Sequence, residues 1–181
     1  YLETARQLGM ENYRQLFSPD TELGRWLATR NTMLRIGRNL FVHAGLSARL
    51  LERDLEMDTL NARMSEGLYR TSKERREDPT LEFLYRSAGP VWYRGMVCAD
   101  EKYDPLTPEQ TDALLRRYDA DRLLVGHTIF PDISTFHDGR VIAVNVQNER
   151  NRRKNRGRAV LIEGSRISVI GNRGVKRVLE E

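Results

Sequence analysis

Two short apolar runs, each ending at a histidine, constrain the fold of this chain more than any other feature. Residues 40–47 read LFVHAGLS and contain His43, and residues 124–128 read LVGHT and contain His127. Short apolar runs bounded by small turn residues are typical of buried strands. The chain has 3 histidines, so two of them lie where a predicted buried strand meets a turn.

Helical periodicity dominates the first part of the chain. Apolar residues recur at helical spacing through residues 1–30, and Ser-Pro-Asp at 18–20 predicts a break between two helices, with Asp20 or Thr21 capping the second. From about 50 to 87 the sequence is charged and helical, and Pro79 separates two helices there. Residues 89–105 look irregular because they contain Gly-Pro and Asp-Pro steps.

Later in the chain the spacing of apolar residues becomes that of β-strands. Thr107, Pro108 and Gln110 have the residue types of a capping box with proline in the first turn, and they predict a helix to about Tyr118. Gly37-Arg38 predicts a hairpin turn. The predicted strands are Thr32–Ile36, Asn39–Val42, Arg122–Val125, Ile133–Phe136, Val141–Val146, Ala159–Ile162 and Ile167–Ile170. Helices followed by strands indicate an α/β (α+β) fold.

Composition limits the class of protein. A length of 181 residues is enough for one domain with a sizeable core. No apolar run approaches the roughly 18 residues of a membrane span, so no membrane partner is expected. Cys98 is the single cysteine, which excludes an internal disulfide and predicts a reducing, cytoplasmic location. The chain starts at Tyr1 without methionine, which leaves open whether an N-terminal part is missing.

The two strand-borne histidines have two interpretations. His43 and His127 are 84 positions apart, so only the fold could bring them together. Neutral imidazoles at strand ends suit Zn, Mn or Fe, and hydrolytic dinuclear centres use them together with carboxylates. Alternatively, each is a core histidine that is hydrogen-bonded to the backbone. The shared strand–histidine–turn context favours the metal interpretation.

Arg94 is the candidate for binding a phosphate. It lies in the segment GPVWYRG at 89–95, where aromatic residues precede it and a glycine follows. The planar guanidinium donates two parallel hydrogen bonds that match a phosphate or a carboxylate. The sequence therefore leaves open whether Arg94 meets a ligand or a carboxylate on a neighbouring helix.

The remaining chemistry-bearing residues have simpler interpretations. His137 precedes Asp-Gly and is predicted to be a solvated turn residue, and Cys98 a partly buried bystander. Residues 149–158 are strongly basic and are interpreted as a long exposed loop between strands. Such a loop is solvated, or attracts an acidic phosphorylated substrate, or binds nucleic acid; it has no aromatic residue that could stack on bases.

Four segments in this order resemble a known family. They are VHAGLS at 42–47, WYRG at 92–95, VGHT at 125–128 and DGRVIAV at 138–144. Together they resemble the C-terminal half of a calcineurin-like metallophosphoesterase, closest to the bacterial and Shewanella-like relatives of the PPP serine/threonine protein phosphatases. The resemblance extends from about residue 40 to 162.

The resemblance implies a fold and a set of site residues. The fold would be half of a four-layer αββα sandwich with a mixed sheet, in which 1–181 form the C-terminal part of one domain and 50–88 a helical insertion. The intact enzyme would hold two divalent metals (Mn, Fe or Zn). His43 and His127 would be ligands of the second metal, and Arg94 would hold a phosphate oxygen as a catalytic residue. The substrate-binding residues would be Arg94, Asn145, Arg150 and Arg152.

The family's first three motifs, GDxH, GDxxDRG and GNHE, do not occur in this sequence. We therefore expect a fragment that is inactive alone and that associates with itself or with a missing N-terminal half. The intact protein is expected to hydrolyse phosphomonoesters, phosphoproteins among them. The alternatives are a dinucleoside-polyphosphate hydrolase of the same superfamily and a non-enzymatic basic module that binds nucleic acid.

Overall fold

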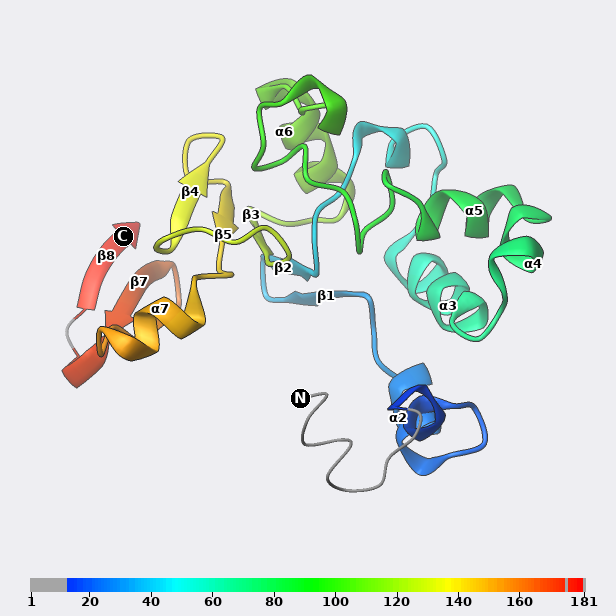
Figure 1. Ribbon diagram of the computed structural model, residues 1–181. Coiled ribbons are helices and arrows are strands. Elements are labelled where there is room, and N and C mark those ends of the chain that lie inside the picture. Colours follow the sequence, from blue (N-terminus) through cyan, green and yellow to red (C-terminus); the bar gives the residue numbers. More distant parts are fainter. Residues whose placement is uncertain (1–12, 175, 181) are drawn as a thin grey trace.

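The computed structural model describes residues 13–174 and 176–180 (Figure 1). Within these ranges a mixed five-stranded sheet has the order β1-β2-β3-β5-β4, and an antiparallel three-stranded sheet has the order β6-β7-β8. The strands are β1 (Met33–Ile36), β2 (Asn39–Val42), β3 (Arg122–Val125), β4 (Ser134–Phe136), β5 (Val141–Ala143), β6 (Arg158–Glu163), β7 (Arg166–Gly171) and β8 (Lys176–Glu180). The predicted α/β class is confirmed.

The helices lie mainly between β2 and β3 in the sequence. The α-helices are α2 (Glu22–Ala28), α3 (Met57–Gly67), α4 (Ser72–Arg76), α5 (Pro79–Tyr85), α6 (Pro108–Arg117) and α7 (Asn148–Arg153). Short 3-10 helices are η1 (Tyr13–Phe17), η2 (Ala48–Leu50), η3 (Glu101–Tyr103) and η4 (Asn172–Gly174). Residues 1–12 of the first predicted helix lie outside the described ranges.

Local capping explains where several helices begin. The Thr21 hydroxyl accepts a hydrogen bond from the Gly24 N–H at the start of α2, at 3.0 Å. The predicted capping box of α6 is formed: Thr107 Oγ1 accepts from Gln110 N at 3.3 Å, and Gln110 Oε1 accepts from Thr107 N at 3.0 Å. Pro79 opens α5 as predicted, with Asp78 as its cap. Each cap satisfies N–H groups that a helix leaves unpaired at its first turn.

The order of the central strands places the chemistry at one sheet edge. Gly37, with a φ of 57°, turns the antiparallel hairpin of β1 and β2. β2 then pairs in parallel with β3, and β3 with β5. Parallel neighbours bring their carboxyl ends to the same edge, so the loops after β2, β3 and β5 are adjacent.

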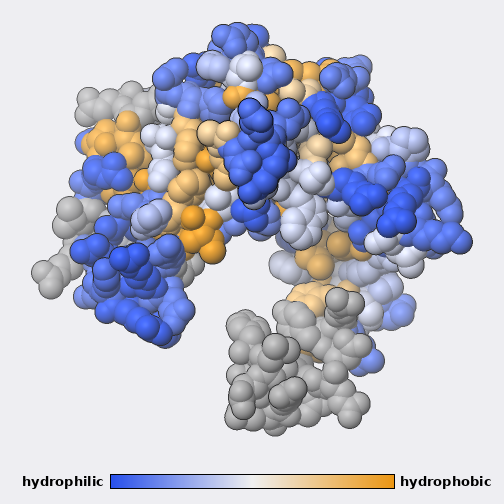
Figure 2. Space-filling model, turned by 45° about the horizontal axis from the view of Figure 1, so that its top comes forward, coloured by the Kyte–Doolittle hydropathy of each residue, from blue (hydrophilic) through white to orange (hydrophobic). Residues whose placement is uncertain are grey.

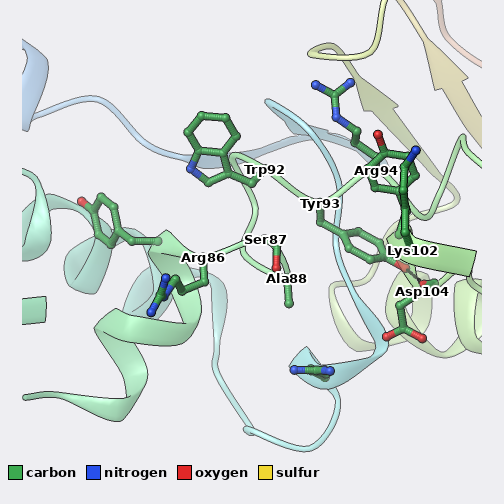
Figure 3. Close-up of a pocket in the computed structure, with 11 residues that line it drawn as sticks. Arg86, Ser87, Ala88, Trp92, Tyr93, Arg94, Lys102 and Asp104 are labelled. Atoms are coloured by element: carbon green, nitrogen blue, oxygen red, sulfur yellow. Dashed lines mark hydrogen bonds between the residues drawn. The ribbon is translucent and has the colours of Figure 1, made fainter. Parts of the chain in front are cut away.

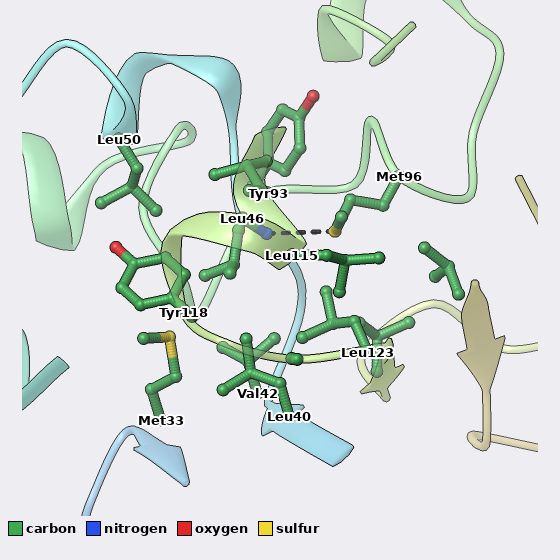
Figure 4. Packing of buried hydrophobic residues seen from close by; sticks show 14 of the residues in the cluster. Met33, Leu40, Val42, Leu46, Leu50, Tyr93, Met96, Leu115, Tyr118 and Leu123 are labelled. Carbon is green, nitrogen blue, oxygen red and sulfur yellow. Dashed lines mark hydrogen bonds between the residues drawn. The ribbon is translucent and has the colours of Figure 1, made fainter. Parts of the chain in front are cut away.

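Alternating side chains divide the five-stranded sheet between two cores. Leu40, Val42, Leu123 and Val125 face the helices and pack with buried residues of α3, α5, α6 and segment 93–97 (Figure 4). Leu124 and Ile142 face the opposite way and pack against Ile167 and Val169 of the second sheet. The described part is therefore layered as helices, sheet and sheet.

The second sheet leaves part of the outer face open. It covers the β3 and β5 side, whereas Leu34 and Ile36 on β1 remain 44% and 59% exposed. Phe41, Leu124 and Val160 line a shallow pocket next to them. Figure 2 shows apolar residues gathering at the hollow on the lower side of the molecule. None of the helices in the described ranges has the length and apolar character needed to span a bilayer.

The basic segment and the C-terminus differ from expectation. Residues 149–158 were expected to form a long loop, but α7 occupies the first half of that segment. A Glu149–Arg153 ion pair at one-turn spacing supports the helix at 2.5 Å. The predicted strand to Val146 ends at Ala143, and Val146 makes an isolated bridge to Phe130 instead. β8 was not expected.

Candidate functional site

The histidines that follow β2 and β3 meet at the carboxyl edge of the sheet. Val42 is the register partner of Val125, which places His43 beside Gly126. The Gly126 N–H donates to the His43 carbonyl at 2.8 Å, and a Cβ at position 126 would approach that oxygen to 3.2 Å. The rings meet in an edge arrangement, with His43 Nε2 and His127 Nδ1 3.1 Å apart. The parallel pairing of β2 and β3 thus brings together two residues 84 positions apart.

His127 is held in a strained backbone conformation. Its φ of 59° lies in the left-handed region, which a residue with a Cβ rarely adopts. A tight turn imposes this φ, because Thr128 N–H donates to the Gly126 carbonyl at 2.6 Å. The edge of the Trp92 ring lies against the imidazole, with centroids 5.5 Å apart at 89°. Backbone strain of this kind is retained where surrounding contacts hold the residue in place, and it is concentrated at functional sites.

The surroundings of His127 favour the neutral form of its ring. Burial is the main cause that lowers its pKa, and the electrostatic effects of Arg94 and then of the neighbouring His43 lower it further. Its Nε2 atom is buried and has no hydrogen-bond partner in the described part of the chain. Buried polar atoms are normally paired, so this nitrogen is positioned for a ligand. It is a donor or an acceptor according to the tautomer that the bond to His43 selects.

Arg94 reaches the same edge from a loop that is tied to the turn after His43. The Ala44 N–H donates to the Pro90 carbonyl at 3.0 Å, which fixes that loop beside β2. The half-buried Arg94 donates from Nη1 to Thr128 Oγ1 at 3.1 Å. Within the described ranges no carboxylate pairs with Arg94. The fold therefore brings three predicted site residues, His43, Arg94 and His127, to one place, with the guanidinium available to an anion.

A pocket of about 520 Å³ opens beside Arg94 (Figure 3). Its walls come from η2, the end of α5, the loop before Arg94 and η3. The lining residues are Arg49, Tyr85, Arg86, Ser87, Ala88, Trp92, Tyr93, Arg94, Lys102, Tyr103 and Asp104. Sequence reasoning did not identify Arg49, Arg86 and Lys102, because these cations lie far apart in the chain and belong to no motif.

Buried groups hold the floor of this pocket. Tyr93 is buried, burial raises the pKa of its phenol, and its hydroxyl donates to the Asp104 carbonyl. A Cβ at Gly95 would collide with that same hydroxyl and carbonyl, so only glycine fits there. The aromatic and glycine residues on either side of Arg94 therefore fix its backbone.

Three further predicted residues lie elsewhere. Asn145 is half-buried, and its carbonyl accepts from Phe130 N–H at 2.9 Å in the neighbouring loop. Arg150 and Arg152 are exposed on α7. None of the three lines the pocket beside Arg94. Their role in substrate binding stays a prediction.

His137 and Cys98 are structural residues. The prediction of a solvated His137 is wrong, because the half-buried ring bonds Thr111 Oγ1 at 3.2 Å and the Met96 carbonyl at 3.0 Å. The Asp-Gly turn after it is present, with positive φ at both residues. Cys98 is partly buried against the helical core as expected, and its N–H donates to the Arg94 carbonyl at 2.9 Å.

The structure resembles solved phosphatase structures. It matches a cold-active protein tyrosine phosphatase at 29% identity with a TM-score of 0.85, over 98% of this chain and 50% of that chain. It also matches the cold-active protein tyrosine phosphatase of a psychrophilic Shewanella species at 28% identity with a TM-score of 0.85. A point mutant of a cold-active protein tyrosine phosphatase matches at 28% identity with a TM-score of 0.84. Both matches cover 98% of this chain and 51% of the other chain. The chain thus spans about half the length of these proteins. No family model and no curated protein matches it.

These matches correct part of the resemblance drawn from the sequence. They are described as protein tyrosine phosphatases, whereas the sequence resemblance was to calcineurin-like metallophosphoesterases. A phosphatase with a relative in Shewanella is common to both. The matches give no support to a dinucleoside-polyphosphate hydrolase or a nucleic-acid-binding module.

The expectation of two divalent metals is wrong. A protein metal centre needs several converging donors. The described residues contain no group of three or more His, Cys, Asp or Glu side chains that could hold an ion. The two imidazoles that do converge are hydrogen-bonded to each other. The residues present therefore do not fit a dinuclear Mn, Fe or Zn centre, and the tyrosine phosphatase matches do not support one.

Proposed function

We propose that the intact protein is a phosphatase that hydrolyses phosphomonoesters, with phosphotyrosine in proteins as its main substrate class. The proposal rests on one observation: two groups that could bind a ligand lie at the same edge of the sheet. They are the Arg94 guanidinium and the Nε2 atom of His127, which has no hydrogen-bond partner among the described residues. The similar solved structures are described as protein tyrosine phosphatases, which supports the same substrate class. A single cysteine in the chain supports a cytoplasmic location.

Each residue has a role in binding the phosphoryl group. Arg94 donates two parallel hydrogen bonds to phosphate oxygens, while Thr128 holds its side chain in place. His43 donates to His127 Nδ1, which leaves a proton on Nε2 for a phosphate or leaving-group oxygen. These donors stabilise the charge that develops on the transferring group.

The nucleophile is assigned to the remainder of the intact protein. Cys98 is packed against the core, and no other cysteine exists. We propose that residues 1–181 form the C-terminal part of one domain, that 50–88 are its helical insertion, and that this chain alone is inactive. The exposed Leu34 and Ile36 face would be covered by the other half, since the chain spans about half of the matched structures.

Replacing His127 with Ala in the intact protein tests the proposal. Hydrolysis of an aryl phosphate should be nearly abolished, because a buried ring nitrogen without a hydrogen-bond partner in the described ranges is removed from this edge. His137→Gln is the matched control, because it changes a histidine that bonds only structural groups. Unchanged turnover in His127→Ala would refute the proposal. Hydrolysis of dinucleoside polyphosphates in preference to phosphotyrosine peptides would refute the substrate class.

A further inference from the structure

The pocket beside Arg94 holds more positive charge than one phosphate requires. Arg49, Arg86 and Lys102 line it together with Arg94, against the single carboxylate of Asp104. Arg49 is exposed and has no ion pair within the described ranges. One phosphomonoester carries a charge of about −2 at most, and Arg94 lies closest to the histidine pair that would share it. The other cations of the pocket are not needed for that phosphate.

The ion pairs of the remaining two cations are easily exchanged. Arg86 pairs with Glu82 at 3.3 Å, one helical turn away, and both side chains are exposed. Lys102 pairs with Asp100 at 2.7 Å, again between exposed side chains. Solvent-exposed pairs contribute little free energy, so a carboxylate of a ligand can replace Glu82 or Asp100 at small cost.

The cations stand apart around the pocket. Arg49 belongs to η2, Arg86 follows α5, and Lys102 lies in η3. Figure 3 shows Arg86 and Lys102 on opposite sides of Ser87 and Ala88. Separated cations match carboxylates spaced along an extended peptide. A polyphosphate, whose charges adjoin one another, needs cations that converge.

An aromatic surface lies between the phosphate-binding edge and the pocket. The Trp92 side chain is 54% exposed, although its ring edge lies against His127. Exposed tryptophan beside charged groups is typical of recognition sites because it offers a large rigid contact surface. A phosphorylated aromatic residue at Arg94 would contact this ring, and its flanking residues would enter the pocket.

We infer that the pocket lined by Arg49, Arg86 and Lys102 binds acidic residues that flank the phosphorylated residue of a peptide substrate. The inference rests on the proposed phosphatase function, which sets the phosphate at Arg94. It deepens that function, because it assigns a sequence preference to a surface separate from the reacting group.

Two phosphotyrosine peptides of equal length test this inference on the intact protein. One carries Asp and Glu around the phosphotyrosine, and the other carries Asn and Gln. The ratio of their kcat/KM values should favour the acidic peptide about tenfold at low salt and fall as salt rises. The double variant Arg49→Gln, Lys102→Gln should lower that ratio about fivefold through KM. Arg177→Gln, an exposed cation on β8, is the control and should keep it.

Fluorescence anisotropy of the same labelled peptides separates the two proposals. If neither peptide is hydrolysed, the phosphatase proposal fails, while tighter binding of the acidic peptide that the double variant removes still supports the pocket assignment. If both are hydrolysed with equal kcat/KM, the pocket assignment fails and the phosphatase proposal stands. A preference for the acidic peptide that persists in the double variant also overturns the assignment. The same holds if a dinucleoside polyphosphate abolishes the preference equally in the wild type and in the double variant.

Discussion

The side-chain amide of Asn61 forms both backbone hydrogen bonds of Met33. Asn61 Oδ1 accepts from Met33 N–H at 2.9 Å, and Asn61 Nδ2 donates to the Met33 carbonyl at 2.8 Å. Both residues are buried. The amide thereby replaces a neighbouring strand at the outer edge of β1 and connects α3 to the sheet.

Asn61→Ala should lower the free energy of unfolding by about 3 kcal/mol, because it leaves a buried N–H and a buried carbonyl without partners. Urea denaturation measures the change. Asn31→Ala is the control, because Asn31 is exposed, and it should change the free energy by less than about 0.5 kcal/mol. Equal losses in the two variants would contradict the role given to the amide.

Arg94→Lys should lower kcat/KM for an aryl phosphate about a hundredfold in the intact protein. Lysine keeps the charge but cannot donate two parallel hydrogen bonds or maintain the contact with Thr128. Steady-state kinetics measure the change, and urea denaturation should show a nearly unchanged free energy of unfolding. Thr128→Val should cause a smaller loss of rate, because it removes only the group that positions Arg94. A rate close to that of the wild type in Arg94→Lys would show that the guanidinium is not needed.

Gly89→Ala should destabilise the protein by about 2–3 kcal/mol. The new methyl group would collide with the backbone carbonyl of Leu84, which cannot move without disturbing the end of α5. Gly164→Asn is the control: Gly164 has a φ of 63° with open space around it, and asparagine tolerates that conformation. Thermal unfolding should separate the two variants by several degrees. Similar melting temperatures would argue against the collision.

Asp78 should make stability depend on pH in the acid range. Its carboxylate pairs with Arg63 and caps α5 by accepting from Thr80 N–H at 2.9 Å and Leu81 N–H at 3.1 Å. The Arg63 hydrogen bond first, and the Leu81 N–H second, lower the pKa of Asp78. A pKa lowered by folding contributes stability above the unfolded pKa of about 3.9, and that contribution is lost as pH falls through the folded pKa.

Asp78→Asn keeps an acceptor at the cap but removes the charge. Its free energy of unfolding should lie below that of the wild type at pH 6, and the gap should close towards pH 2. Urea titrations across this range measure the gap. Glu77→Gln, at the exposed neighbouring position, should show no comparable closing gap. A constant difference between Asp78→Asn and the wild type would contradict the linkage.

Sequence pattern predicted the elements whose causes are local. Thr107 with Gln110 defined the start of α6, and Gly37 the hairpin, because capping and turn chemistry act within a few residues. The two histidines were expected to need the fold to meet, and parallel pairing of β2 and β3 provides it. β8 escaped prediction because its pattern is largely polar and its strand exists only through pairing with β7.

The candidate site was predictable only in part, because local sequence context identifies some of its residues and only the tertiary fold brings in the others. His43, Arg94 and His127 each lie in a distinctive local context, so the sequence identified them. The remaining pocket cations are ordinary surface residues until η2, α5 and η3 converge. The two-metal expectation came from the strand-end context of the two histidines and from the family resemblance, and the described side chains provide too few converging donors for it.

The parallel pairing of β2 with β3 also bears on how the protein folds. The intervening segment contains four α-helices, so the two strands close one of the longest loops in the domain. Contacts between residues so far apart in the sequence form late and slow the folding rate. Closing the loop costs chain entropy before the contacts contribute favourable free energy. The contact between the His43 and His127 rings should therefore be among the last native contacts to form. Spectroscopic observation of that imidazole pair would report the completion of folding, whereas helix content would report its early steps.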